Sequence, residues 1–337
     1  MTIKDIARLS GYSIGTVSRV INRHPDVSEE AREKILKIIE QENYQPNANA
    51  KHLKQSRNTA VTVIVKGTRN IFLNSILEKI QQYLRKYQEE ASVVFVEESE
   101  NEVRQAIQLE TERNPKGFIF LGGALEHFRT DFHMIKAPSV LISGWAKDLG
   151  FDNLSSFSTD DFEGGRQAME MLVNNGHRNV LIVGGFNSKE PEQVSSQRLN
   201  GALSVLKEHD IPFERDRQYI ECRFSMQDSY EKLMDRLPVE QDITAIFGLS
   251  DLVAVGAMRA VHDSGRTVPD DISIIGYDGI GYTDYTVPRL STVRQNVDEL
   301  VAQGVDDLLY RIQYPREAVH RQISAAAVSK ESIISIA

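Results

Sequence analysis

The sequence predicts a small all-helical unit at the amino terminus, then a linker, then a two-lobed α/β body with parallel sheets. Helix caps and helical periodicity fill the first 45 residues, whereas residues 46–58 are polar. From Ala60 onward, short β-branched runs alternate with helical patterns. Near-continuous apolar strands that alternate with helices are typical of parallel sheets covered on both faces. About 280 residues of this pattern exceed one comfortable core, so two lobes are expected.

The amino-terminal unit (residues 1–45) is expected to hold three short helices. The first begins after the candidate N-cap Thr2 and ends before Gly11, and the second follows Ser13. The third follows the candidate N-cap Ser28, with acidic residues in its first turn, where the helix dipole favours them. Each helix carries apolar side chains at helical spacing. Three helices of this size form a small core, and domains of this kind do fold.

The first two helices have the spacing of a helix-turn-helix, whose second helix enters the major groove. Val17 and Val20 of that helix face the core, which leaves Ile14, Gly15, Ser18 and Arg19 on the outer face. An arginine there can donate two hydrogen bonds to guanine, and Thr16 and Ser18 suit phosphate contacts. A generic three-helix bundle with a solvated arginine fits the local pattern equally well.

The linker at residues 46–58 offers a single large apolar side chain, Leu53, and cannot bury itself alone. The body that follows is expected to have strands at Ala60–Val65, Val93–Glu97, Gly117–Leu121, Val140–Ser143, Val180–Gly184, Ala245–Gly248 and Ser273–Tyr277, with a further one at Tyr219–Cys222. The expected helices are Phe72–Tyr87, Val103–Arg113, Gly164–Asn175, Gln197–His209, Ser229–Leu237 and Leu252–Ser264.

Charge and composition narrow the class of protein. Residues 1–57 carry ten basic and seven acidic side chains, a charge of +3, which leaves −12 on the rest of a chain whose net charge is −9. A small basic unit on an acidic body suits a protein that touches phosphate with one end only. The start shows no export signal and no apolar run approaches the roughly 18 residues of a membrane span, so we expect a cytoplasmic protein without a membrane segment.

Enzymatic and metal chemistry find little support. The single cysteine, Cys222, excludes an intramolecular disulfide and a cysteine-based metal site. The eight histidines contain no H-x-x-x-H pair. Gly184-Gly185-Phe186 follows a strand but lacks the G-x-G-x-x-G pattern of dinucleotide binding. We therefore expect no enzyme, no cofactor and no metal.

Long runs of the sequence resemble the lactose repressor/galactose repressor family. The head of that family is matched by Thr2–Ser13, Thr16–Asn22, Val27–Glu30 and Tyr44–Ala48, and its body by Gly176–Arg178, Arg198–Gly201, Val268–Ser273, Ile275–Asp278 and Pro288–Val293. The resemblance covers essentially the whole chain. It implies a transcriptional repressor with a periplasmic-binding-protein-like body, divided into a first lobe of about 60–157 plus 289–318 and a second of about 158–288 plus 319–337.

The same resemblance implies the DNA contacts. The linker would become a hinge helix over Asn47–Lys54 when two copies meet at the minor groove, with Leu53 wedged into the central base step. An idle leucine in a flexible tether is the alternative. Sequence preference would rest on Ile14, Gly15 and Arg19. The full set of expected contacts is Thr2, Ser13, Ile14, Gly15, Thr16, Ser18, Arg19, Asn22 and His24 in the head, and Asn47, Ala50, Lys51, Leu53 and Lys54 in the linker.

A small-molecule effector is expected in the cleft between the lobes, where strand carboxyl ends face each other. The residues expected to bind it are Arg69, Phe72, Asp160, Arg198, Phe224, Ser250, Asp251 and Asp278. Simpler roles remain open for several of them: packing for Phe72, helix capping for Asp251, and a lobe-stabilising ion pair for Arg198 with Asp278. Thr159-Asp160 departs from the Asp-Asn common in the family. The sole tryptophan, Trp145, suits either a sugar or an interior position.

The resemblance thus predicts a repressor of a carbohydrate-utilisation operon, released or tightened by an effector that is a sugar. A purine- or nucleoside-responsive repressor is the alternative, and a sugar-binding protein without a DNA role is a third. We expect a homodimer, because two head units related by a two-fold axis match the two halves of a palindromic operator. No leucine heptad follows the last expected strand, so a tetramer built by such a tail is not expected.

Overall fold

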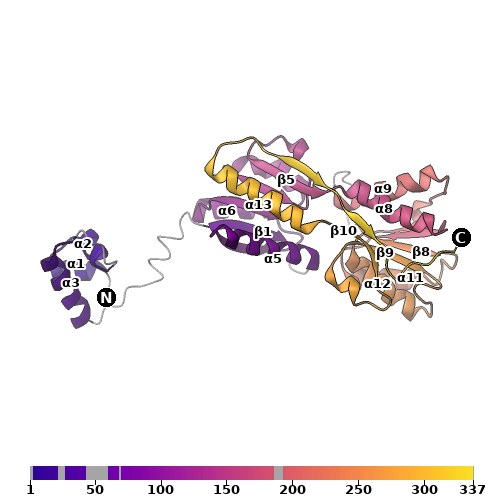
Figure 1. Cartoon of the computed structure of the whole chain (residues 1–337), viewed down its shortest axis with the longest axis horizontal. Coiled ribbons are helices and arrows are strands. Elements are labelled where there is room, and N and C mark those ends of the chain that lie inside the picture. The colour runs from indigo at the N-terminus through magenta and orange to yellow at the C-terminus, as the bar shows by residue number, and fades with distance from the viewer. Residues whose placement is uncertain (1–2, 22–26, 43–59, 68–69, 186–192, 337) are drawn as a thin grey trace. The chain divides into compact units, whose positions relative to one another are not determined.

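The computed structural model describes residues 3–21, 27–42, 60–67, 70–185 and 193–336. The chain divides into two compact units, residues 1–57 and 58–337 (Figure 1). Each is described by itself below. No helix in the described ranges is long and apolar enough to cross a membrane.

The first unit contains the three predicted helices, α1 (Ile3–Ser10), α2 (Ile14–Ile21) and α3 (Glu29–Gln41). Ser13 Oγ accepts a hydrogen bond from the Thr16 amide (3.1 Å), and Ser28 caps α3 through the Ala31 amide. Gly11 adopts a positive φ of 75°, which lets the chain turn sharply between α1 and α2. The core is formed by Ile6, Ala7, Val17, Val20 and Ile35. Helical spacing and capping residues therefore account for this unit.

The second unit is built on two six-stranded sheets (Figure 1). The first has the order β11 (His320–Ile323), β5 (Leu154–Thr159), β4 (Ser139–Ile142), β3 (Gly117–Leu121), β1 (Ala60–Lys66), β2 (Glu90–Val96), and all its pairings are parallel. The second has the order β12 (Ala326–Val328), β10 (Ser291–Arg294), β9 (Ser273–Asp278), β8 (Ala245–Gly248), β6 (Val180–Val183), β7 (Tyr219–Ile220). Only β12 runs antiparallel to its neighbour.

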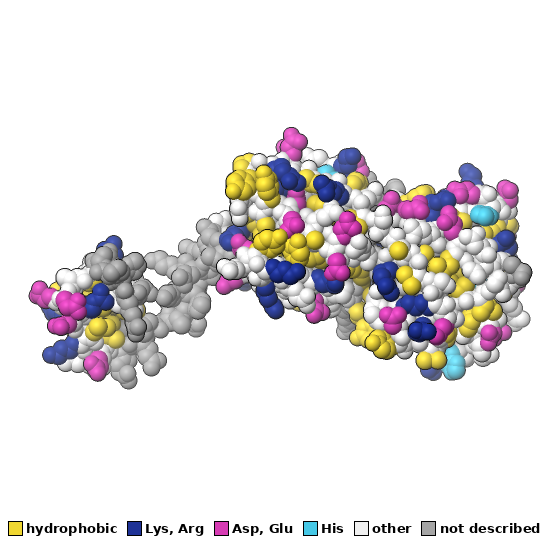
Figure 2. All heavy atoms as spheres, viewed as in Figure 1, with side chains coloured by type: hydrophobic (Ala, Val, Ile, Leu, Met, Phe, Trp, Pro, Cys, Tyr) yellow, Lys and Arg dark blue, Asp and Glu magenta, His cyan; other side chains and the backbone are white. Residues whose placement is uncertain are grey.

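Helices cover both faces of each sheet. The first lobe carries α5 (Ile71–Lys86), α6 (Glu102–Arg113), α7 (Leu125–Asp131) and α13 (Val297–Gln313), and the second carries α8 (Asp161–Asn174), α9 (Val194–Glu208), α10 (Arg215–Gln218), α11 (Met226–Arg236) and α12 (Asp251–Asp263). Each lobe therefore has two buried apolar clusters, one on either side of its sheet. The surface in Figure 2 intersperses acidic and basic side chains over this unit.

The chain crosses between the lobes three times, and the pairings correct the predicted lobe bounds. Segment 289–318 was assigned to the first lobe, but its strand β10 pairs with β9 of the second sheet. Segment 319–337 was assigned to the second lobe, but β11 pairs with β5 of the first. The first lobe therefore comprises 60–159 and 297–323, and the second 161–294 and 326–336. A strand belongs to the lobe whose sheet it hydrogen-bonds to. The local sequence of a strand does not show which strand it will pair with.

Candidate functional site

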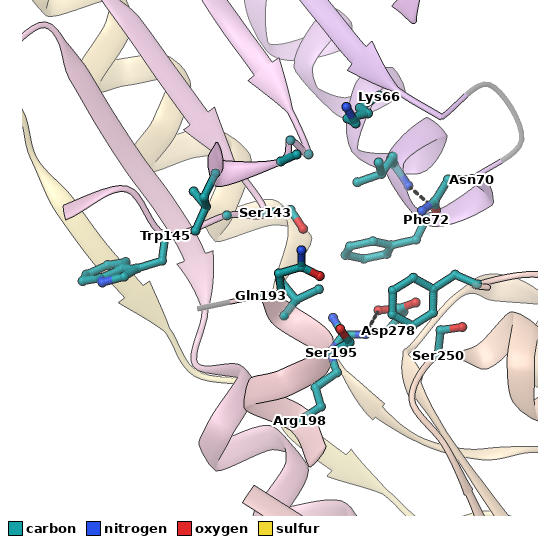
Figure 3. A pocket seen from close by; sticks show the side chains of 18 of the residues that line it. Lys66, Asn70, Phe72, Ser143, Trp145, Gln193, Ser195, Arg198, Ser250 and Asp278 are labelled. Atoms are coloured by element: carbon teal, nitrogen blue, oxygen red, sulfur yellow. Dashed lines mark hydrogen bonds and ion pairs between the residues drawn. The ribbon is translucent and has the colours of Figure 1, made fainter. Parts of the chain in front are cut away.

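A cavity of about 240 Å³ lies between the lobes, where strand ends of both sheets face each other. Its first-lobe wall includes Lys66 at the end of β1 and Phe72 near the start of α5. Its second-lobe wall includes Arg198 on α9, Phe224, and Asp278 at the end of β9. Figure 3 shows Lys66 and Phe72 on one side and Arg198 and Asp278 on the other. Such a position is the usual place for ligands in parallel α/β folds.

The second-lobe floor is a buried ion-pair network centred on Arg198. The Arg198 guanidinium donates from Nε to Asp161 Oδ1 (2.8 Å) and from Nη1 to the Leu249 carbonyl (2.7 Å). Its Nη1 also lies 3.3 Å from Asp278 Oδ1, which accepts a second bond from Gln295 Nε2. The guanidinium carbon stands 3.7 Å from the centre of the Tyr277 ring. The arginine is thereby held rigidly, with one side toward the cavity.

A third carboxylate, Asp251, lies behind this floor and is wholly buried. It accepts hydrogen bonds from the Ile280 amide (2.8 Å) and from Thr292 Oγ1 (2.6 Å). It therefore ties the start of α12 to the chain that follows β9. Gly276 of β9 makes room for it, because a Cβ there would stand 2.3 Å from Asp251 Oδ1.

Arg198 pairs with Asp161 and Asp278, Asp251 lies behind them, and burial perturbs the titration of all three carboxyls. Desolvation is the largest cause and raises the pKa of Asp161, of Asp251 to about 8 and of Asp278 to about 6. The Asp278 charge raises the pKa of Asp251 further, whereas Arg198 opposes the rise for Asp161 and Asp278. Burial therefore favours the neutral form of these carboxyls, whose oxygens remain hydrogen-bond acceptors in the second-lobe floor.

Apolar side chains form another part of the cavity wall. Phe72 and Leu73 come from the first turn of α5, which begins where Asn70 Oδ1 caps the Leu73 amide (3.2 Å). Phe224 faces the cavity from the second lobe, before the Ser225 cap of α11. Rings placed next to a charged pair can pack on the apolar faces of a ligand while the polar groups meet its edges.

The structure brings five of the eight predicted effector residues to this cavity: Phe72, Arg198, Phe224, Ser250 and Asp278. Two others lie elsewhere, which corrects their predicted placement. Asp160 caps α8 through the Glu163 amide (3.0 Å), so its neighbour Asp161 is the residue that meets Arg198. Asp251 lies one layer behind, and Ser250 is the cap of α12. Arg69 lies outside the described residues.

Several residues lining the cavity were missed by sequence reasoning. Lys66, Gln193 and Ser195 all line it. Lys66 could have been recognised from the sequence, because it is the one charged residue in β1 and stands at the end of that strand. Trp145 also borders the cavity, but Figure 3 shows its indole pointing away from the other labelled side chains. That ring instead lies edge-on to His320, with 6.0 Å between the ring centres.

The predicted DNA-contacting residues of the head lie at the start of and along α2. Ile14 is 46% exposed, and Ser13, Gly15 and Arg19 are also exposed, whereas Thr16 and Ser18 are half-buried. Val17 and Val20 face the core as expected. The remaining predicted contacts, Thr2, Asn22, His24, Asn47, Ala50, Lys51, Leu53 and Lys54, lie outside the described residues. Among the residues that are described, no three His, Cys, Asp or Glu side chains gather as a metal site would require.

Comparisons with known proteins agree with this architecture. Residues 2–47 match the family "Bacterial regulatory proteins, lacI family", and residues 154–333 match the "Periplasmic binding protein-like domain". The HTH-type transcriptional regulator MalR of Clostridium butyricum is 34% identical over 342 aligned residues, covering 100% of both chains. The ribose operon repressor of Haemophilus influenzae is 32% identical, covering 99% of both.

A solved structure supports the fold independently. The Lac repressor dimer bound to operator and the anti-inducer ONPF has a TM-score of 0.73 to this chain at 24% identity, and the match covers 98% of each chain. The predicted fold, a helix-turn-helix unit followed by a two-lobed body like the periplasmic binding proteins, is thus confirmed.

Proposed function

This chain belongs to the lacI family of bacterial regulatory proteins, and we propose that it represses a carbohydrate-utilisation operon under the control of a sugar effector. The relatives that match it along the whole chain are transcriptional regulators, so its coarse role is DNA-binding transcriptional regulation. The operon class and the effector are our inference. A regulator of bacterial operators acts where the DNA is, so we place it in the cytoplasm.

One observation carries the sugar proposal: a buried Arg198–Asp278 pair lies beside aromatic side chains in a small cavity between the lobes. Arginine and carboxylate together present donors and acceptors that suit neighbouring hydroxyl groups. Phe72 and Phe224 supply apolar surfaces for the ring. The relative named as a ribose operon repressor agrees with this chemistry.

The proposed DNA interface is the exposed face of α2. Arg19 is the side chain there that can read guanine, and Ile14 can meet a thymine methyl. Ser13, Thr16 and Ser18 suit phosphate contacts, and Gly15 lets the backbone approach. We infer a homodimer on a palindromic operator, because two such helices related by a two-fold axis read two matching half-sites.

Control by the effector follows from the position of the cavity. Side chains of both lobes line it, so a ligand there gains or loses contacts when the lobes move relative to each other. A ligand shifts the equilibrium only by the difference in its affinity for the two lobe arrangements. The effector therefore acts on DNA binding by favouring one arrangement.

The test begins with the full chain and a palindromic duplex selected from random DNA. Melting temperatures are then measured with ribose, glucose, maltose, glucuronate, galacturonate, guanine and hypoxanthine. A true effector at a hundred times its dissociation constant adds about 2.7 kcal/mol of stability and alters operator affinity. Asp278→Asn should abolish that stabilisation, and Asp270→Asn, at an exposed position of the same lobe, should retain it.

The outcomes separate the candidate functions. Stabilisation by a sugar, with release or tightening on the operator, supports the proposal. Stabilisation by guanine or hypoxanthine alone favours a purine-responsive repressor. A chain that binds a sugar but no palindromic duplex would not be a repressor.

A further inference from the structure

A second polar cluster lies at the first-lobe end of the cavity. Lys66 is the last residue of β1 and lines the cavity wall. Its Nζ donates to Glu102 Oε2 (2.5 Å) and to the Glu100 carbonyl (2.7 Å). The Lys66 side chain is 12% exposed. Two fixed acceptors hold this long side chain in one position, so little conformational entropy is left to lose when a ligand binds.

Glu102 is the anchor of that cluster. Its side chain is 0% exposed, at the start of α6, and it accepts hydrogen bonds from three elements. Besides Lys66, the Ala124 amide donates to Oε1 (2.6 Å), and His127 Nδ1 lies 2.8 Å from Oε2. Glu102 thus fixes the end of β1, the loop after β3 and the start of α7, all at the rim of the cavity.

The Lys66 ammonium has three donors, and the described residues supply acceptors for two of them. Figure 3 shows Lys66 above Phe72, across the cavity from Arg198 and Asp278. Because Lys66 lines the cavity, its third donor can reach a ligand at the end farthest from the second-lobe floor.

We propose that Lys66 is a specificity-determining residue that donates to the effector from the first lobe, and that the effector is an uncharged polyhydroxyl compound held between Lys66 and the Arg198–Asp278 pair. This inference rests on the function proposed above and narrows its ligand class. A sugar hydroxyl both accepts and donates, so one hydroxyl can accept from Lys66 while another donates to Asp278.

Charge compensation at both ends of the cavity disfavours an anionic effector. Lys66 is already neutralised by the buried Glu102, so the first-lobe end offers a donor without a net positive charge. At the other end, the Arg198 guanidinium is already paired with the carboxylates of Asp161 and Asp278. A carboxylate or phosphate on the ligand would find, at either end, only a cation that is already paired with a carboxylate. A uronate or sugar phosphate should therefore bind more weakly than the matching neutral sugar.

The experiment compares two lysine variants of the full chain. Lys66→Met removes the proposed donor, and Lys116→Met is the matched control. Lys116 also adjoins a strand of the first sheet and also pairs with a glutamate, Glu89 (2.6 Å), but does not line the cavity. Dissociation constants for ribose, glucose, maltose, glucuronate and galacturonate are measured by calorimetry, beside the melting temperature without ligand.

We expect the wild-type chain to bind at least one of the three neutral sugars and to prefer it to the two uronates. Lys66→Met should weaken that binding about 10- to 100-fold, the value of one hydrogen bond from a charged donor. Lys116→Met should leave it within about twofold. A third variant, Glu102→Gln, removes the compensating charge, so the affinity for a uronate should rise relative to that for glucose, which a purely structural pair would not produce.

Each contrary result would refute a different part of the proposal. If Lys66→Met binds the sugar as the wild type does, Lys66 is a structural residue while the proposed function stands. If glucuronate or galacturonate binds the wild type more tightly than the neutral sugars, the uncharged class is wrong. If none of the five compounds binds, the sugar proposal fails and this inference falls with it.

Discussion

Replacing Arg198 by methionine tests whether the second-lobe network is held together by its single guanidinium. Methionine is long enough to occupy much of the same space but provides neither charge nor donor. The change leaves Asp161 and Asp278 buried without their cation, and the Leu249 carbonyl without its donor. Arg198 is only 4% exposed, so water cannot compensate for these losses.

The expected magnitude follows from that burial. Removing one partner of a buried ion pair costs about 3–5 kcal/mol, because the remaining charge stays uncompensated. Arg289 provides the contrast: it lies 2.7 Å from Glu331, but the two side chains are 58% and 49% exposed. Exposed pairs contribute about 0–1 kcal/mol, so Arg289→Met should be nearly neutral.

The assay is urea unfolding of the full chain at pH 7.5, with Arg289→Met as control. Arg198→Met should lower the free energy of unfolding by about 3–5 kcal/mol. The deficit should shrink at pH 5, where the carboxyls whose pKa burial has raised can take up protons. A loss below about 1 kcal/mol at pH 7.5 would refute the reasoning, since it would mean that the network carries no uncompensated charge.

Three further predictions concern DNA preference, pH and packing. Arg19→Ala on α2 should cost about 1–3 kcal/mol of discrimination between the operator and a scrambled duplex, without unfolding the chain. Arg8→Ala on α1 should leave that discrimination unchanged. Equal affinity of the wild type for the two duplexes would contradict this prediction. Burial, then the Asp278 charge, raises the pKa of Asp251 to about 8, above its unfolded value of about 4. The folded chain therefore retains that proton longer, so this contribution to stability is complete below pH about 4 and is lost as the pH rises to about 8. In urea unfolding, Asp251→Asn should reduce the loss of unfolding free energy as the pH rises. The same dependence on pH in the variant and the wild type would argue against this role of Asp251. Gly201→Ala should lower the free energy of unfolding in urea by about 1–3 kcal/mol, because its Cβ would stand 2.0 Å from the Phe162 carbonyl where α8 meets α9. A Cβ at Gly281 would meet no heavy atom within 4 Å, so Gly281→Ala should leave the free energy of unfolding unchanged.

Local rules predicted the cavity well where a residue follows a strand. Asp278 was placed at the cleft because the carboxyl ends of parallel strands converge there, and the structure brings it to the cavity. The same rule also applies to Lys66, which ends β1 and lines the cavity. Asp160 was expected to bind the effector, but it caps α8, and its neighbour Asp161 pairs with Arg198 without lining the cavity.

The pairing of strands was the part of the fold that the sequence predicted least well. The segments that became β5, β11 and β12 are short and partly polar, and no local pattern distinguishes them from loops. The long helix α13 was also left unassigned. These segments make up much of the crossover region, which explains why the predicted lobe bounds were exchanged between β10 and β11.

The sequence by itself determined the kind of protein this is: helix caps, helical spacing and matching motifs lie close together along the chain, and neighbouring residues are enough to specify them. Only the tertiary structure decided which carboxylate meets Arg198, which strand joins which sheet, and that Glu102 neutralises Lys66 beneath the cavity wall. Those pairs are separated by tens of residues, and their energies depend on burial and on distances of a few ångströms. Neither quantity exists until the chain has folded.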